Sequence, residues 1–158
     1  TDKLPPEQLA LMYNLADVTI NISDAEGFGL ATLESLACET PILVNMTGGL
    51  QEQVTDGENW FGVGIEPSSK AVIGSQSVPY IYEDRINKED FLDGLTKLYN
   101  MSLEERKDLG KSGREYLMKN YNFEDYGQRW VDLMLSVHEK FGSWETRKHY
   151  KSWEMVEL

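Results

Sequence analysis

A strand, a helix and a second strand within residues 18–44 constrain the fold of this chain more than any other feature. Residues 18–22 alternate and are rich in β-branched side chains, which is typical of a half-buried strand. Residues 30–38 carry apolar side chains at helical spacing, and residues 41–44 form the continuous apolar run of a buried parallel strand. Two parallel strands joined by a helix make a right-handed βαβ unit, so the sequence predicts an α/β fold.

The same alternation extends on both sides of this unit. Residues 6–16 start with a proline and an acid and continue with apolar residues at helical spacing, which predicts a helix. After Thr47-Gly48-Gly49 another helix is expected through Val54, and residues 60–63 are typical of a third strand. The order helix, strand, helix, strand, helix, strand predicts a Rossmann-like parallel sheet over residues 1–65.

The rest of the chain divides into three parts. Residues 66–87 are punctuated by Ser, Gly and Pro and are assigned to an insertion or loop, in which residues 80–82 could form a short strand. Residues 88–141 are expected to be C-terminal helices, and residues 142–158 form a tail without clear periodicity. The helix boundary signals are a capping box of Ser102 with Glu105, a start at Asn122 or Glu124, and an end at Gly142.

Charge and composition exclude several classes of protein. Among 158 residues, 15 are Lys or Arg and 27 are Asp or Glu, so the net charge of −12 opposes binding to nucleic acid. No apolar run reaches the roughly 18 residues that a membrane span needs, while membrane association of other kinds stays open. The single cysteine, Cys38, is expected to be a small buried side chain, and its isolation favours a reducing, cytoplasmic setting.

A candidate ligand site follows the first strand. In a doubly wound sheet, ligands bind beyond the carboxyl ends of the strands, and residues 24–30 occupy that place with two glycines before a helix. Exposed N–H groups and the helix dipole suit a phosphate there. Glu26 and Glu34 flank the loop, eight positions apart, and carboxylates accept hydrogen bonds from vicinal hydroxyls. The alternative is that these acids only complement the helix dipole.

Further motifs carry a family resemblance. In chain order they are Ala16-Asp17-Val18, Glu26-Gly27-Phe28-Gly29-Leu30, Glu34, Leu36-Ala37-Cys38, Thr40-Pro41, Gly48-Gly49-Leu50, Glu52, Asp56-Gly57 and Asn59. Together they resemble the C-terminal domain of retaining GT-B-fold glycosyltransferases of the large group 1 family, which includes glycogen-synthase-like members. Glu26 and Glu34 occupy the Glu-x7-Glu signature of that family. The resemblance is strong over residues 4–63 and looser over the helices to residue 141.

The resemblance implies a role for each candidate site residue. Glu26 is similar to the catalytic-site glutamate that holds the hydroxyls of the donor sugar, and Glu34 to the glutamate that binds the ribose hydroxyls. Thr47 and Gly48 resemble a turn that faces the same cleft, with a plain structural turn as the alternative. The backbone implied to meet the sugar and diphosphate consists of Gly27, Phe28, Gly29 and Leu30.

Several features depart from the family pattern. Glu39 stands where members usually have glycine, so the turn before Pro41 is expected to be reshaped. Asp24-Ala25 replaces a more usual bulky residue, and residues 66–84 look longer than usual. Residues 18–57 contain no Lys or Arg, although the family neutralises the donor diphosphate with a basic pair that lies upstream of such a region.

These departures predict that the chain is part of a longer enzyme. The sheet is expected to be incomplete, with an exposed edge, and the chain alone is expected to be inactive. The helix around Trp130 resembles the family's last helix, which packs on an N-terminal domain. The aromatic side chains of Trp144, Tyr150 and Trp153 are expected to contact that domain or a partner.

The function implied is transfer of a hexose from a GDP- or UDP-linked sugar to an acceptor with retention of configuration. The acceptor is a glycan, a lipid or a small molecule, and neither a cofactor nor a metal is implied. No Cys/His cluster has the spacing of metal ligands. Two alternatives stay open: another GT-B enzyme, such as a sugar-nucleotide epimerase or a phosphorylase, and a non-catalytic binding domain.

Overall fold

The structure is a computed structural model that describes residues 4–149. Contacts divide the chain into two units, Thr1–Asn120 and Tyr121–Leu158. Parts of the predicted tail, including Tyr150 and Trp153, lie outside the described residues. None of the helices between residues 4 and 149 combines the length and apolar character needed to cross a membrane.

The first unit contains the predicted α/β sheet. Three parallel strands lie in the order β1-β2-β3, so the sheet is open, with β1 at one edge and β3 at the other. The elements are α1 (Pro6–Leu15), β1 (Thr19–Asn21), α2 (Leu30–Ala37), β2 (Ile42–Asn45), α3 (Leu50–Val54) and β3 (Gly62–Ile65). Their order confirms the alternation that the sequence predicts. Ile20 in the edge strand β1 is 43% exposed.

The third strand begins two residues later than the pattern predicts. Trp60 pairs with Thr55 in an isolated antiparallel bridge, and the N–H of Phe61 donates to the carbonyl oxygen of Val54. These two residues therefore close the turn at Asp56-Gly57 before the parallel strand starts at Gly62. Apolar character alone does not separate such a turn closure from the strand that follows it.

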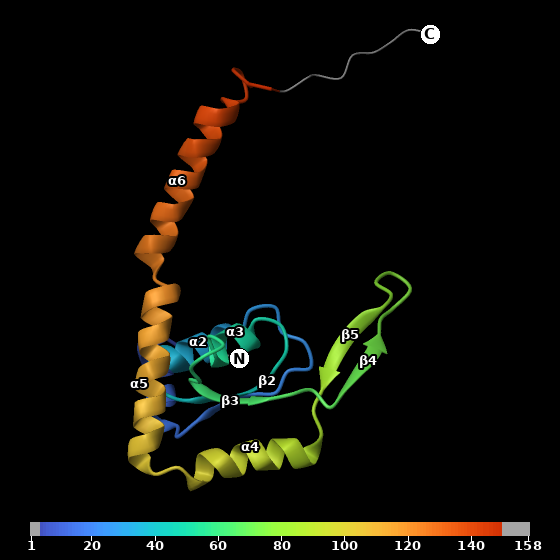
Figure 1. The fold of residues 1–158 in the computed structure, drawn as a ribbon, viewed down its shortest axis with the longest axis vertical. Coiled ribbons are helices and arrows are strands. Elements are labelled where there is room, and N and C mark those ends of the chain that lie inside the picture. The colour runs from blue at the N-terminus through green and yellow to red at the C-terminus, as the bar shows by residue number, and fades with distance from the viewer. Residues whose placement is uncertain (1–3, 150–158) are drawn as a thin grey trace. The chain divides into compact units, whose positions relative to one another are not determined.

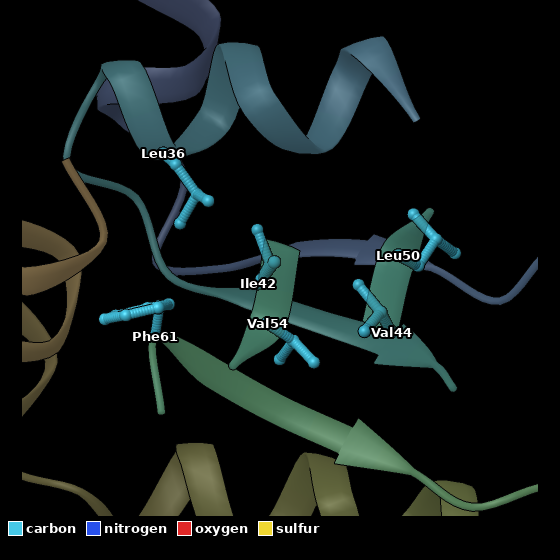
Figure 2. Packing of buried hydrophobic residues seen from close by; sticks show 6 residues of the cluster. All are labelled: Leu36, Ile42, Val44, Leu50, Val54 and Phe61. Atoms are coloured by element: carbon cyan, nitrogen blue, oxygen red, sulfur yellow. The ribbon is translucent and has the colours of Figure 1, made fainter. Parts of the chain in front are cut away.

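Both faces of the sheet are covered by helices (Figure 1). On one face, side chains of α2 and α3 pack against β2, and Phe61 lies at the edge of this cluster, as Figure 2 shows. On the other face, Leu43 packs with side chains of β3 and with Leu98 of α4 (Lys88–Asn100). All four residues of β2 are buried, which explains the continuous apolar run in its sequence. The first cluster consists of Leu36, Ile42, Val44, Leu50, Val54 and Phe61.

Helix α5 (Leu103–Asn120) opens with the predicted capping box. The N–H of Ser102 donates to a carboxylate oxygen of Glu105 at 2.7 Å, and the N–H of Glu105 donates to Ser102 Oγ at 3.2 Å. Farther along the helix, Gly110 lies so close to Glu39 that a Cβ atom would overlap the carbonyl oxygen of Glu39. The missing side chain therefore lets α5 approach the turn that follows α2.

The predicted insertion at residues 66–87 forms an antiparallel β-hairpin. Strands β4 (Ser69–Ile73) and β5 (Ile81–Arg85) pair with Ser69 opposite Arg85 and Ile73 opposite Ile81. The sequence pattern indicates only the start of β5, at residues 80–82. Most side chains of the hairpin are exposed, so its sequence lacks the apolar alternation of a half-buried strand. The hairpin is the green arm in Figure 1.

The second unit consists mainly of α6 (Phe123–Phe141). Asn122 caps it by accepting a hydrogen bond from the N–H of Asp125 at 3.0 Å, and Gly142, with a φ of 79°, ends it. Both boundaries are among those predicted. Within this unit Trp144 is 79% exposed, and the Arg147 guanidinium lies 4.1 Å from the centre of its ring.

Glu39 adopts a backbone conformation that favours glycine. Its φ is 60°, so the turn before Pro41 has left-handed geometry at this glutamate. We expect Glu39→Gly to raise the free energy of unfolding by about 1 kcal/mol, because glycine removes the steric penalty of positive φ. Urea denaturation measures this change. Glu39→Gln, which removes only the exposed ion pair with Arg114 (3.8 Å), should have little effect, and equal stabilities of the two variants would contradict the prediction.

Candidate functional site

The loops that follow β1 and β2 meet at the carboxyl edge of the sheet. The N–H of Gly49 donates to the carbonyl oxygen of Glu26 at 3.3 Å. Gly48 has a φ of 47°, and a Cβ atom there would overlap the same carbonyl oxygen. The structure therefore brings the Thr47-Gly48-Gly49 turn and the Glu26 loop into direct contact, since they follow the neighbouring parallel strands β2 and β1.

The two glycines of the first loop differ in their surroundings. Gly29 caps α2 with a φ of 87°, and a Cβ atom there would lie 2.6 Å from Leu50 and 2.8 Å from Thr32. Gly27 has no atom within 4 Å of its hypothetical Cβ, so its surface faces open space. Gly29 therefore serves close packing, whereas Gly27 leaves room beside Glu26 and the exposed Phe28.

A buried polar network supports this loop from below. Gln53 of α3 is fully buried, and its amide nitrogen donates to the carbonyl oxygen of Phe28. Thr32 of α2, also fully buried, bonds to the amide oxygen of Gln53 and to the carbonyl oxygen of Gly29 (2.7 Å). No pattern in the sequence indicates these two residues, although buried polar side chains beside a glycine loop are a recognisable signal once burial is known.

Glu34 lies on the exposed side of α2 and has a partner on α1. The hydroxyl of Tyr13 donates to a carboxylate oxygen of Glu34 at 2.9 Å. Burial, together with this hydrogen bond and the charge of Glu34, raises the pKa of Tyr13 to about 12. Tyr13 is a further residue that the sequence did not indicate. It holds one oxygen of the Glu34 carboxylate.

The raised pKa of Tyr13 gives a pH prediction. Neutral Tyr13 is favoured in the folded state, so the contact stabilises the fold fully below pH 10 and is lost as the pH rises through about 12. Subtracting the ultraviolet titration of Tyr13→Phe from that of the parent should isolate one tyrosine that ionises near pH 12. In Glu34→Gln this pKa should fall, because the negative charge is gone. A difference curve centred near pH 10 in the parent would contradict the prediction.

The hairpin joins the site at its base. Asn45, the fully buried last residue of β2, donates to the carbonyl oxygens of Ser23 (2.9 Å) and Asp84 (2.8 Å). Thr47 is 4% exposed, and its hydroxyl donates to the Asp84 carboxylate at 2.8 Å. The Thr47 side chain is thus hydrogen-bonded within the protein and is not a free group of the turn.

Basic side chains also reach this edge through the hairpin. Arg85 lies 3.0 Å from the carboxylate of Asp24, and Lys70 lies 3.5 Å from that of Asp84. The sequence of residues 18–57 supplies no cation, and the family pattern places cations upstream. The hairpin brings two cations, Arg85 and Lys70, to the carboxyl edge of the sheet, where each is paired with a carboxylate.

Two other kinds of chemistry find no site in the part of the chain described. Among residues 4–149 no group of three or more His, Cys, Asp or Glu side chains is arranged to hold a metal ion. Cys38 is half-buried, and burial raises the pKa of its thiol, with Arg114 opposing and Glu34 adding to that shift. A protonated thiol is a poor nucleophile, so Cys38 is suited to packing.

Fold and site together define an α/β domain with a Rossmann-like parallel sheet. A parallel sheet with a glycine turn and a helix N-terminus at its carboxyl edge is the arrangement that such folds use for phosphate groups. The family model of glycosyl transferases group 1 matches residues 1–116. The chain therefore belongs to the group 1 glycosyltransferases, which confirms the resemblance of its motifs.

Individual relatives support the same family. The D-inositol 3-phosphate glycosyltransferase of Acidothermus cellulolyticus is 34% identical over 116 residues, which cover 66% of this chain and 26% of that protein. The protein of the same name from Thermomonospora curvata is 41% identical over 70 residues, 44% of this chain and 16% of the relative. The chain thus spans about a quarter or less of the length of these relatives.

A solved structure shows the same fold. Sucrose-phosphate synthase from Thermosynechococcus elongatus superposes with a TM-score of 0.63 and 25% sequence identity, covering 86% of this chain and 30% of that chain. This similarity extends beyond the residues that the family model matches. The chain has a GT-B glycosyltransferase domain, as the motifs in the sequence predict.

Proposed function

We propose that this chain forms the donor-binding part of an enzyme that transfers a hexose from a GDP- or UDP-linked sugar to an acceptor with retention of configuration. The observation that carries the proposal is the contact between the Glu26 loop and the Gly48-Gly49 turn, at the start of the helix that bears Glu34. Along the chain, Glu26 and Glu34 flank a glycine turn and a helix N-terminus. A nucleoside-diphosphate sugar has hydroxyls at both ends and phosphates between them, which is the complementary order.

Each part of the donor has a proposed partner. Glu26 binds hydroxyls of the transferred sugar, and Glu34, steadied by Tyr13, binds the ribose hydroxyls. The backbone at residues 27–30 meets the diphosphate, where N–H groups and the dipole of α2 stabilise the negative charge that develops on the leaving group. We propose that cations complete this stabilisation without a metal ion. The surface left open by Gly27 gives the sugar room to approach Glu26.

Glu34→Ala tests the ribose assignment. Loss of charge-assisted hydrogen bonds to two hydroxyls is expected to weaken donor binding about 10- to 100-fold. Calorimetry with UDP-glucose and GDP-mannose measures the affinity of the parent and the variant. The matched control is Glu52→Ala, which removes an exposed acid from α3 and should leave affinity within about twofold. Equal affinities of Glu34→Ala and the parent would overturn the assignment, as would equal losses in both variants.

A further inference from the structure

Asp84 makes three hydrogen bonds to two segments of the candidate site. Its N–H donates to the carbonyl oxygen of Asp24 at 2.7 Å, and its own carbonyl oxygen accepts a hydrogen bond from Asn45 at 2.8 Å. Its carboxylate accepts a hydrogen bond from the hydroxyl of Thr47 at 2.8 Å. One residue of β5 thus uses its donor, its carbonyl and its side chain to hold the ends of two loops.

These contacts close a ring around the backbone of Glu26. From Asp84 the ring runs through Asp24 to Glu26, crosses to Gly49 through the 3.3 Å hydrogen bond, and returns through Thr47 to the Asp84 carboxylate. The ring leaves little freedom for the loop, because Gly48 already abuts the Glu26 carbonyl group. A displacement of Asp84 must therefore move Glu26 or break one of these bonds.

The base of the hairpin is anchored, and its outer part is exposed. Arg85 pairs with Asp24 at 3.0 Å beside the ring, and Lys70 pairs with the Asp84 carboxylate at 3.5 Å. Farther out, Val72 is 59% and Tyr82 is 62% exposed, so these strands contribute little to the buried core. The described polar contacts of the hairpin with the sheet thus gather at the loops that carry the candidate site.

We infer that Asp84 is a positioning residue that holds the Glu26 loop in its donor-binding geometry. The β4–β5 hairpin is therefore a structural part of the site. The inference rests on the proposed function for the identity of the ligand. The physical coupling between Asp84 and the Glu26 loop is independent of any ligand. It predicts that loss of the Asp84 carboxylate loosens the Glu26 loop before it affects the core of the sheet.

Amide hydrogen exchange of the unliganded chain tests this coupling. In Asp84→Ala the N–H of Gly49, which donates to Glu26, should exchange about tenfold faster, while the amides of Leu43 and Val63 in the core keep the parent rate. Asp84→Asn should restore slow exchange, because an amide oxygen still accepts the Thr47 hydroxyl. Lys70→Ala, which removes the exposed ion pair alone, should resemble the parent. Thr47→Val breaks the same bond from the other side and should reproduce the effect if Asp84→Ala does not fold.

The outcomes separate this inference from the proposed function. Unchanged exchange at Gly49 in folded Asp84→Ala, or in Thr47→Val, would overturn the positioning role whatever the donor affinity. An equal increase in the exchange rate of the core amides would also overturn it, because it would indicate general destabilisation. Donor affinity of the parent chain, measured by calorimetry, tests the proposed function alone. If the donor binds, Asp84→Ala should weaken it about tenfold and Asp84→Asn should recover most of the loss.

Discussion

Gly48→Ala is expected to lower the free energy of unfolding by about 2–4 kcal/mol. Gly48 has a φ of 47°, and a Cβ atom there would overlap the carbonyl oxygen of Glu26. That oxygen belongs to the backbone and cannot rotate away as a flexible side chain does. The Gly49 hydrogen bond to the same oxygen should break when the two loops separate. Urea denaturation, monitored by tryptophan fluorescence, measures the loss.

Gly57→Ala is the matched control for this substitution. Gly57 also has a positive φ, 95°, but no atom lies within 4 Å of its hypothetical Cβ. This variant carries only the conformational penalty, about 1 kcal/mol. The difference between the two variants therefore measures the close approach of the loops. If both variants lost the same free energy of unfolding, Gly48 could not lie in close contact with the Glu26 carbonyl group.

Asn45→Asp is expected to destabilise the fold by about 3–5 kcal/mol at neutral pH. The Asn45 side chain is fully buried, and its amide nitrogen donates to the carbonyl oxygens of Ser23 and Asp84. A carboxylate has nearly the same shape but no donor, so both carbonyl groups would face a negative charge. The loss of stability relative to the parent should be smaller at acidic pH, because a protonated carboxyl group can donate one of the two hydrogen bonds.

The control for Asn45→Asp makes the same chemical change on the surface. Asn14 of α1 is exposed, and its amide donates to the carbonyl oxygen of Ala10. Asn14→Asp should therefore change stability by less than about 0.5 kcal/mol. Urea denaturation measures the free energy of unfolding of both variants. Comparable losses in the two would contradict the role of the Asn45 hydrogen bonds in joining the loops.

Burial explains why much of the fold could be predicted from the sequence and the hairpin could not. Residues 42–44 of β2 are buried and therefore form an unbroken apolar run, while α2 and α4 show helical spacing on the sides that pack against this strand. Strands β4 and β5 are mostly exposed. Val72 and Tyr82 pair with each other across the hairpin but contribute no alternation between buried and exposed positions, so no periodic signal marks these strands.

Before the structure, only the family resemblance indicated that the Gly48 turn faces the same cleft as the Glu26 loop. The two loops follow neighbouring parallel strands, which explains their contact. The bonds of Glu34 to Tyr13 and of Asp84 to Thr47 join residues 21 and 37 positions apart, and no local pattern encodes them. Which residue supports a loop from a distant element depends on packing that a single sequence does not display.

The most direct test of donor binding is a titration of the isotope-labelled chain with UDP-glucose and GDP-mannose, followed by nuclear magnetic resonance of its amides. The amides of residues 27–30 and of Gly49 should shift saturably with at least one of the two donors, and Glu34→Ala should weaken the response at least tenfold. No shift at about 10 mM of either donor would contradict the proposed site. A saturable response confined to the opposite edge of the sheet, around Trp60, would contradict it equally.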